Sequence, residues 1–373
     1  MKIGITCYPT YGGSGVIATE LGKSLAKRGH EVHFISYALP FRLSHFVENI
    51  YFHEVELSTY PLFEHSLYSL SLTSKMVEVA KYENLDLLHV HYAIPHATSA
   101  YLAQQILGEQ HKIKVITTLH GTDITLVGLE PSFIHLMKFS IEKSDGVTAV
   151  SNYLKKKTHK NYKLKKDIEV IPNFVDTSIF TPDAPPPQRC HLAPNGEKLL
   201  LHISNFRPVK RVTDTIRILE LVNREVPAKL LLIGDGPERS ECERLARELK
   251  VNDRVIFLGK QEGLVDIINC SDLFLLPSQS ESFGLSALEA MACGKPAIAS
   301  SVGGIPEVVI HNETGYIAEI GDVERMAKYA IDLLKNDKKY QRFSKNALEL
   351  AKQFDVSVVI PQYERYYETI LNS

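Results

Sequence analysis

The chain has 373 residues, which at roughly 150 residues per domain predicts two domains, and its 44% apolar and 23% charged residues are ordinary for a soluble globular protein. The 42 basic and 44 acidic residues give a net charge of −2, which excludes a globally basic nucleic-acid surface, and the composition excludes disorder as the main class. We expect neither a signal peptide nor a membrane-spanning helix, because no apolar run approaches about 20 residues. The five scattered cysteines contain no C-x-x-C pair, which favours a reducing, cytoplasmic location.

The first half of the chain alternates predicted strands and helices. A predicted buried strand at 2–7 precedes a glycine-rich loop at 11–15, a stretch with helical spacing, and a second predicted strand at 31–36. This order of elements is typical of a parallel crossover unit. Further strands are predicted at 86–90, 114–119, 146–150 and 169–171, with a helix at 66–82.

A composition break divides the chain. Residues 181–187 read Thr-Pro-Asp-Ala-Pro-Pro-Pro, which predicts a stiff connector because the prolines cannot continue a helix or a central strand. The alternation then restarts, with strands predicted at 198–203, 229–233, 254–258, 273–276 and 296–299 and closing helices at 323–335, 338–353 and 357–371. The predicted fold class is therefore α/β, with two doubly wound, Rossmann-like domains and a ligand at the carboxyl ends of the strands, between the domains.

The glycine loop near the N-terminus is the first candidate site. Gly12-Gly13-Ser14-Gly15 places backbone N–H groups at the start of a helix, where they can bind an anion or simply make a tight turn. The next strand ends in Phe34-Ile35-Ser36, without the acidic residue that binds a ribose in nicotinamide sites. The loop alone leaves both interpretations open.

Residues 277–296 form the most informative segment. Ser282 or a neighbour can cap a helix whose first N–H groups, near Phe283 to Leu285, would face an anion. Glu281 lies just outside that helix start, and Glu289 follows eight residues later, about 12 Å along a helix. One ligand could meet both carboxylates, although an amphipathic helix with two solvated glutamates would show the same spacing.

The same segment resembles a known enzyme family. Glu281-Ser282-Phe283-Gly284-Leu285 through Glu289 matches the E-x7-E signature of retaining glycosyltransferases of family 4, which have the GT-B fold. The resemblance extends over nearly the whole chain, including the segments 12–15, 118–123, 234–238 and 303–307. It implies an acceptor-binding domain over 1–180, a nucleotide-sugar-binding domain over 190–354, and a C-terminal helix at about 355–373 that packs back on the first domain.

Within the family, a closer resemblance points to a particular reaction. It is carried by the segments 4–9, 12–15, 40–43, 91–97 and 204–211. It implies transfer of N-acetylglucosamine from UDP-N-acetylglucosamine to the hydroxyl of L-malate, the first step of bacillithiol biosynthesis. The alternatives are a family 4 enzyme with a lipid or inositol phosphate acceptor, a nucleotide-sugar epimerase, and a non-catalytic sensor of sugar nucleotides.

The resemblance also implies roles for individual residues. Glu281 would contact hexose hydroxyls, Glu289 the ribose, and Arg207 and Lys210 the diphosphate, where fixed cations stabilise the charge of the leaving group. The family usually places an arginine five residues before the lysine, where this chain has Asn205, so Arg207 would serve either the diphosphate or the acceptor. The predicted catalytic residues are His120, Arg207, Lys210 and Glu281, and the donor-binding residues are Gly13, Ser14, Lys260, Phe283, Gly284, Leu285 and Glu289.

The acceptor pocket is predicted from the resemblance and the topology. A small dicarboxylate needs hydrogen-bond donors at both ends. The predicted acceptor-binding residues lie at strand ends or glycine loops and are Ser14, Tyr92, Thr118, Ser151, Asn152 and Arg207. The resemblance further implies a homodimer and no metal, since the chain has no D-x-D motif.

Two further patterns have alternative interpretations. His89 and His91 share one face of a predicted strand, so with His96 they could ligate zinc, or they could line the acceptor pocket at the strand end. The lysine-rich run at 155–166 could dock on anionic lipid, or it could be a solvated helix face.

Overall fold

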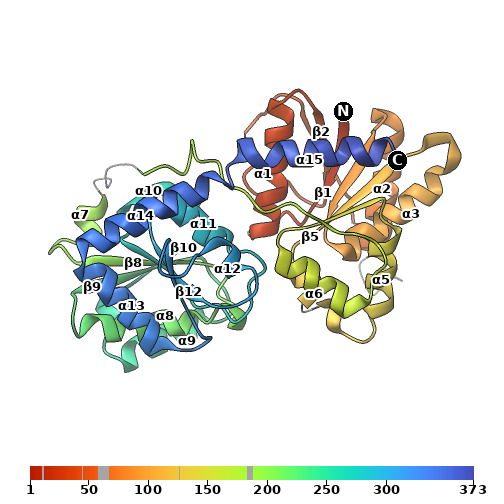
Figure 1. Cartoon of the computed structure of the whole chain (residues 1–373). Helices are drawn as coiled ribbons and strands as arrows, with labels where there is room; N and C mark the ends of the chain where they lie inside the picture. The colour runs from red at the N-terminus through yellow and green to blue at the C-terminus, as the bar shows by residue number, and fades with distance from the viewer. Residues whose placement is uncertain (11, 44, 58–66, 126, 183–187) are drawn as a thin grey trace. The chain divides into compact units, whose positions relative to one another are not determined.

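The computed structural model describes residues 1–373 apart from 11, 44, 58–66, 126 and 183–187. The described chain divides into two compact units, each built on a parallel sheet (Figure 1). Unit 1 comprises Met1–Asn173 and Ser357–Ser373, and unit 2 comprises Phe174–Val356. Most of the predicted connector, residues 183–187, lies outside the described residues.

Unit 1 contains a seven-stranded sheet in the order β3-β2-β1-β4-β5-β6-β7, with every pair parallel. Its strands are β1 (Lys2–Thr6), β2 (Glu31–Ser36), β3 (Ile50–Glu54), β4 (Leu87–His91), β5 (Lys114–Leu119), β6 (Gly146–Ala149) and β7 (Glu169–Val170). Its helices are α1 (Gly13–Lys27), α2 (Tyr68–Glu83), η1 (Ala93–Ala97), α3 (Thr98–Leu107), η2 (Gly108–His111), α4 (Thr122–Thr125), η3 (Val127–Leu129), α5 (Ile134–Lys143), α6 (Asn152–Tyr162) and α15 (Val356–Leu371).

Unit 2 contains a six-stranded parallel sheet in the order β10-β9-β8-β11-β12-β13. Its strands are β8 (Lys198–Ile203), β9 (Ala228–Ile233), β10 (Val255–Gly259), β11 (Leu273–Leu276), β12 (Ala297–Ser300) and β13 (Gly315–Ala318). Its helices are α7 (Gln188–Leu192), η4 (Pro208–Lys210), α8 (Val212–Asn223), α9 (Arg239–Glu248), η5 (Asn252–Arg254), α10 (Leu264–Cys270), α11 (Leu285–Ala292), α12 (Ile305–Val308), α13 (Val323–Lys335) and α14 (Asp337–Lys352).

The strands form where apolar residues run without interruption, because both faces of a parallel sheet are buried. β8 and β9 each bury five of their six residues. The helices instead bury one stripe, as in α13, where the buried residues Met326, Ala330 and Leu333 recur at helical spacing and Asp322 accepts a hydrogen bond from the Arg325 N–H at the helix start.

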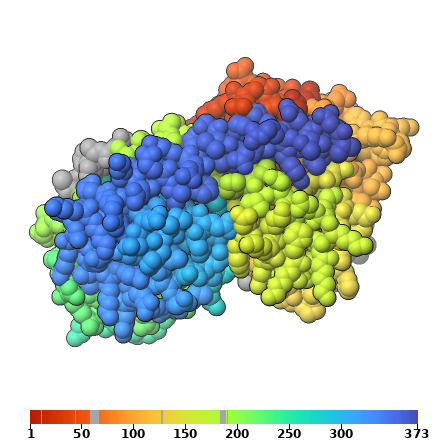
Figure 2. All heavy atoms as spheres, in the orientation of Figure 1, coloured from red at the N-terminus to blue at the C-terminus, as the bar shows by residue number. Residues whose placement is uncertain are grey.

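The C-terminal helix α15 belongs to unit 1. Glu364 accepts hydrogen bonds from the Arg28 guanidinium at 2.7 and 2.8 Å, and Tyr367 bonds the Nδ1 of His89 at 2.7 Å. In the space-filling view this dark-blue helix lies beside the red N-terminal segment (Figure 2). Among the described residues, none of the helices is long and apolar enough to cross a membrane.

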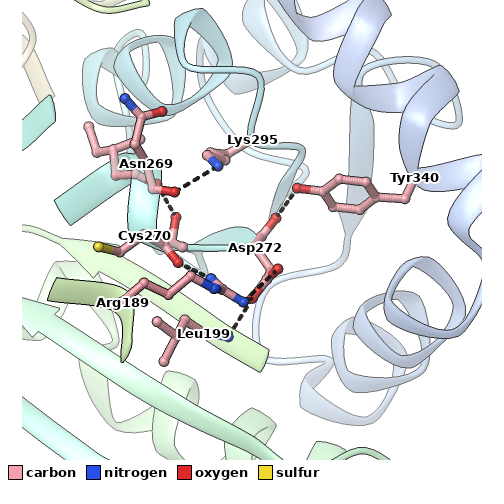
Figure 3. A network of polar contacts seen from close by, with 9 residues as sticks. Arg189, Leu199, Asn269, Cys270, Asp272, Lys295 and Tyr340 are labelled. Carbon is pink, nitrogen blue, oxygen red and sulfur yellow. Dashed lines mark hydrogen bonds and ion pairs between the residues drawn. The ribbon is translucent and has the colours of Figure 1, made fainter. Parts of the chain in front are cut away.

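Asp272, at the start of β11, ties several parts of unit 2 together (Figure 3). Its carboxylate accepts hydrogen bonds from the Leu199 N–H at 2.7 Å and from the Arg189 guanidinium at 2.9 Å. Its carbonyl accepts from the Tyr340 hydroxyl at 2.8 Å, and Arg189 also donates to the carbonyl of Cys270. The network joins α7, the sheet and α14 at the end of the sheet where β8 and β11 begin.

The structure confirms most predicted elements and adds others. The strands at 31–36, 114–119, 198–203 and 273–276 and the helix at 323–335 have the predicted bounds. The strands β3 and β13 and the helices α3 and α5 were not predicted from the sequence. The predicted helix at 66–82 is α2, which begins at Tyr68, whereas Ser66 lies outside the described residues.

Candidate active site

In unit 2, the predicted donor residues gather after β8 and before α11. The Lys210 ammonium donates a hydrogen bond to the Glu281 carboxylate at 2.7 Å, and the two side chains are 21% and 17% exposed. The backbone holds the same two segments together, because the Gln279 N–H donates to the Val209 carbonyl at 2.8 Å. The structure therefore brings together Lys210 and Glu281, which are 71 residues apart in the chain.

Two glycine loops pack closely against the backbone of the segments that carry these site residues. A Cβ on Gly303, whose φ is +62°, would lie 1.8 Å from the Glu281 carbonyl oxygen, and Gly304 donates its N–H to that oxygen at 3.0 Å. A Cβ on Gly234, whose φ is +117°, would lie 1.7 Å from the Ser204 carbonyl oxygen. Only glycine permits these close backbone approaches, which hold the segments that carry Glu281 and Arg207.

The helix start agrees with the predicted first turn near Phe283 to Leu285, capped by Ser282 or a neighbour. α11 begins at Leu285, and the cap is the neighbour Gly284, in the left-handed region with φ +100°, rather than Ser282 itself. In the loop before the helix, the Glu281 carbonyl accepts a hydrogen bond from the Gly304 N–H. The Phe283 side chain is buried against Phe354, with ring centroids 5.6 Å apart, and only its backbone is left for a ligand.

The remaining donor residues occupy different environments. Arg207 is exposed, and within the described parts of the chain its guanidinium has no ion pair or hydrogen bond. Glu289 is a buried carboxylate on α11, and Lys260 is exposed directly after β10. Because Arg207 is exposed, its guanidinium is available to an anionic ligand.

In unit 1, the predicted residues follow the carboxyl ends of four neighbouring strands. Ser14 follows β1, Tyr92 follows β4, His120 follows β5, and Ser151 follows β6. The Tyr92 hydroxyl donates to the Ser14 oxygen at 2.7 Å, and the Tyr92 and His120 ring centroids are 5.5 Å apart. These two contacts bring three predicted residues together at one edge of the sheet.

Of three other predicted residues, two have structural roles and the third is exposed. Ser151 caps α6 by accepting from the Leu154 N–H at 3.1 Å, and Asn152 is exposed at the first position of that helix. Thr118 is fully buried, and its hydroxyl bonds the Nε2 of His89 and the hydroxyl of Thr148, both at 2.7 Å. The Thr118 side chain thus lies inside the unit. The basic run at 155–166 covers the second half of α6 and the segment after it.

Burial keeps the histidines of this edge uncharged. His91 Nδ1 lies 2.7 Å from His120 Nε2, and the His89 and His91 rings stack at 4.6 Å, which confirms that they share one face. Burial, with smaller contributions from neighbouring histidines, lowers the pKa of His120 and of His89 to about 3 each, and that of His91 well below its ordinary value. No metal-ligand grouping in the described residues includes these rings, so the zinc interpretation of His89, His91 and His96 is not supported.

Asp123 and Tyr8, for which the sequence predicted no role, lie in the same region of unit 1. The Asp123 carboxylate accepts from the N–H groups of Ala93 and Gly121 at 3.0 and 3.1 Å, while burial raises its pKa to about 6. Tyr8 packs against Tyr92, with ring centroids 5.4 Å apart. Their position directly after β1 and β5 was the available signal.

Comparisons with known proteins show to which family the chain belongs. Residues 11–179 match the family model described as Glycosyltransferase Family 4, and residues 188–350 match that of glycosyl transferases group 1. N-acetyl-alpha-D-glucosaminyl L-malate synthase of Bacillus anthracis is 52% identical over 373 residues, covering 100% of this chain and 97% of that protein. The chain belongs to glycosyltransferase family 4. This confirms the predicted family and enzyme class.

More distant relatives of this family 4 glycosyltransferase agree. D-inositol 3-phosphate glycosyltransferase of Mycolicibacterium smegmatis is 33% identical over 211 residues, which cover 53% of this chain and 47% of that protein. The structure of HepE from Anabaena, in complex with UDP and glucose, matches with a TM-score of 0.82 over 99% of both chains, at 20% identity. The family 4 chain therefore has the predicted GT-B fold.

Proposed function

We propose that the chain transfers N-acetylglucosamine from UDP-N-acetylglucosamine to the hydroxyl of L-malate, with retention of configuration. The observation that carries the choice of reaction is the 52% identity, over the full chain, to a protein named for this product. The observation that supports the site is the ion pair between Lys210 and Glu281, which joins the residue proposed for the diphosphate to the residue proposed for the hexose.

In this proposal, unit 2 binds the donor. Glu281 bonds hexose hydroxyls, Glu289 the ribose hydroxyls, and Lys260 borders the uracil, while the backbone of 283–285 faces the diphosphate at the start of α11. The carboxylate of Glu281 holds the Lys210 ammonium at 2.7 Å, so the cation is oriented before the diphosphate arrives. Because the chain has no D-x-D motif, Lys210 and Arg207 supply the positive charge that a metal ion supplies in other transferases.

Unit 1 binds the acceptor. Ser14, Tyr92, Ser151 and Asn152 offer hydroxyl, amide and backbone groups to the malate, and Thr118 positions the His89 ring behind them. The exposed Arg207 guanidinium suits a carboxylate as well as a phosphate, because its planar donors match both. Gly13 and Ser14, at the start of α1, also border the donor.

In the transfer step, the bond between the anomeric carbon and the UDP oxygen breaks through an oxocarbenium-like sugar. The malate oxygen forms the new bond on the same face, and its proton passes to the departing phosphate oxygen, which leaves as UDP. Lys210, Arg207 and the start of α11 stabilise the charge that develops on the phosphate. The neutral His120 imidazole offers a hydrogen bond near the sugar without adding positive charge.

The test is a UDP-release assay with UDP-N-acetylglucosamine and other UDP-sugars, offered with L-malate, other hydroxy acids, inositol phosphates or lipid vesicles. We expect UDP release that depends on malate and on UDP-N-acetylglucosamine. Release that malate leaves unchanged but an inositol phosphate raises would contradict the proposed acceptor. The partial match to an inositol-phosphate transferase makes that arm the necessary comparison.

A variant series tests the site. Lys210→Ala and Glu281→Ala should each slow transfer at least tenfold, or about 1.4 kcal/mol in barrier, while the protein stays folded. Lys335→Ala and Glu225→Ala are matched controls, because that pair also lies at 2.7 Å in unit 2 but is about half exposed on the surface. Arg207→Ala separates the two roles of Arg207, since it raises KM for the donor if it binds diphosphate and KM for malate if it binds the acceptor. Wild-type rates in both Lys210→Ala and Glu281→Ala would remove this assignment.

A further inference from the structure

Two histidines and a glutamate meet on unit 1, on elements that carry none of the predicted active-site residues. His33 is on β2, His53 is on the neighbouring strand β3, and Glu83 is the last residue of α2. Each offers one ligand atom, and these three atoms all lie within 4.8 Å of one another. His33 is 1% exposed, and the other two residues are half-buried.

We propose that His33, His53 and Glu83 form a binding site for Zn²⁺. Two imidazoles, one carboxylate and an open fourth position make up a ligand set that zinc accepts in proteins. Two nitrogens bound to one zinc ion at about 2.0–2.1 Å, in tetrahedral geometry, lie about 3.3 Å apart. His33 Nδ1 and His53 Nε2 lie 2.9 Å apart, so the two rings need to separate by a few tenths of an ångström and turn toward the ion to bind it together.

The surroundings of His33 favour ligation through Nδ1. Its Nε2 lies 3.0 Å from the Glu31 carboxylate, so the ring proton sits on Nε2 and the lone pair of Nδ1 faces His53. A carboxylate that accepts the second N–H of a ligating histidine is the usual outer partner in zinc sites. Glu31 is itself held by the Lys2 ammonium at 2.8 Å, which makes it a fixed positioning residue.

Packing limits how the first ligand can move. The His33 ring stacks on Tyr51 with centroids 5.0 Å apart and an interplanar angle of 18°, and it meets the His53 ring edge to edge, with centroids 5.2 Å apart. The nearby Lys75 ammonium is paired with Glu78 at 2.8 Å. An ion bound here would fasten the edge strand β3 and the end of α2 to β2.

The decisive experiment is Zn²⁺ binding to the metal-free full-length protein, measured by competition with a chromogenic chelator. We expect one equivalent to bind, and we expect His53→Gln and Glu83→Gln each to weaken binding at least tenfold. Glu31→Gln should weaken binding about tenfold, as an outer partner does, without removing a ligand. His135→Gln is the matched control, because His135 is an exposed histidine on α5 of the same unit and should leave binding unchanged.

A second measurement does not depend on the competition assay. Added Zn²⁺ should raise the midpoint of thermal unfolding of the wild type and of His135→Gln, but not that of Glu83→Gln, whose substitution removes a charge and keeps the shape. If His53→Gln fails to fold, Glu83→Gln alone decides. The proposal is overturned if the wild type binds no Zn²⁺, or if Glu83→Gln binds as tightly as the wild type. In that case the two histidines form only a hydrogen bond with each other.

Discussion

Mild acid should destabilise unit 1 much more than unit 2. Unit 1 buries four histidines whose pKa values lie far below the ordinary value of 6.5, namely His89, His91, His96 and His120. Burial is the main cause in each case, and it lowers the pKa to about 3 for His89 and His120 and to about 4 for His96. In the described part of unit 2, the corresponding histidine is His202, whose pKa burial lowers to about 4.

The sign follows from proton binding. Below pH 6.5 the unfolded chain protonates these imidazoles while the folded chain does not, so the unfolded state binds more protons and stability falls as the pH falls. The loss begins near pH 6.5 and continues down to the folded pKa values. Each histidine that stays neutral lowers the free energy of unfolding by about 1.4 kcal/mol at pH 5.5, against about 0.1 at pH 7.5.

For unit 1, four such histidines amount to about 5 kcal/mol between pH 7.5 and 5.5. Asp123 opposes this, because its folded pKa of about 6 lies above the ordinary 3.8 and the folded state takes up its proton first. That contribution offsets part of the loss, on the order of 1 kcal/mol at pH 5.5. The net loss of about 4 kcal/mol is a large part of the stability of one domain, whereas unit 2 should lose only about 1 kcal/mol through His202.

The assay must report the units separately. The protein is equilibrated in urea at pH 7.5, 6.5 and 5.5, and a brief deuterium pulse at one fixed pH marks the open amides. Mass spectrometry of peptides from β4 and β5, and from β8 and β9, then gives the unfolding midpoint of each unit. His202→Gln should flatten the pH dependence of unit 2 and leave that of unit 1 unchanged. A loss in unit 1 smaller than that of one histidine would refute the argument.

Three other predictions follow from particular contacts. Gly303→Ala should lower the free energy of unfolding of unit 2 by over about 2 kcal/mol in urea and slow transfer at least tenfold, because the new Cβ meets the Glu281 carbonyl. Gly196→Ala is the control, with φ +76° and open space around it, and should cost only about 1 kcal/mol. Asp272→Asn should lower the stability of unit 2 by about 2–3 kcal/mol in the same unfolding assay, since it weakens the hydrogen bonds to Leu199 and Arg189. The surface variant Glu225→Gln is the control and should change the stability by under about 0.5 kcal/mol. Tyr92→Phe leaves the Ser14 hydroxyl without its 2.7 Å partner, so it should lower the free energy of unfolding by about 1 kcal/mol. In steady-state kinetics it should raise KM for malate more than KM for the donor. An unchanged KM for malate would count against a role of Tyr92 in acceptor binding.

The elements that the sequence predicted well are those with a continuous local signal. The strand at 114–119 contains four consecutive β-branched residues, Val115 to Thr118, and its bounds agree with β5. β3 was missed because Ile50–Glu54 is half exposed and mixes polar with aromatic residues, so neither alternation nor a buried run marks it. β13 reads Gly-Tyr-Ile-Ala, with only two residues typical of a strand, whereas β11, which has the same length, is an unbroken apolar run of Leu-Phe-Leu-Leu.

The candidate site divides in the same way. The sequence located Lys210 and Glu281 through a family resemblance, but no spacing could show that residues 71 apart form an ion pair. The sequence predicted a cap at Ser282 or a neighbour, and the structure shows that the cap is Gly284, whose left-handed φ of +100° no local pattern could choose over Ser282. His89 and His91 were placed on one face by strand alternation, but their partners Thr118 and His120 come from the next strand and its end.

The two units carry different kinds of polar group, and this difference fits the proposed chemistry. The carboxyl edge of unit 1 holds hydroxyls and imidazoles that burial keeps neutral, whereas unit 2 holds the charged set of Arg207, Lys210 and Glu281. A sugar that becomes positive in the transition state is repelled by a nearby imidazolium, so a protonated His120 would raise the barrier. The leaving diphosphate needs the opposite, namely fixed cations. The low pKa of His120 thus follows from burial, and the same burial suits that residue to a position beside the reacting sugar.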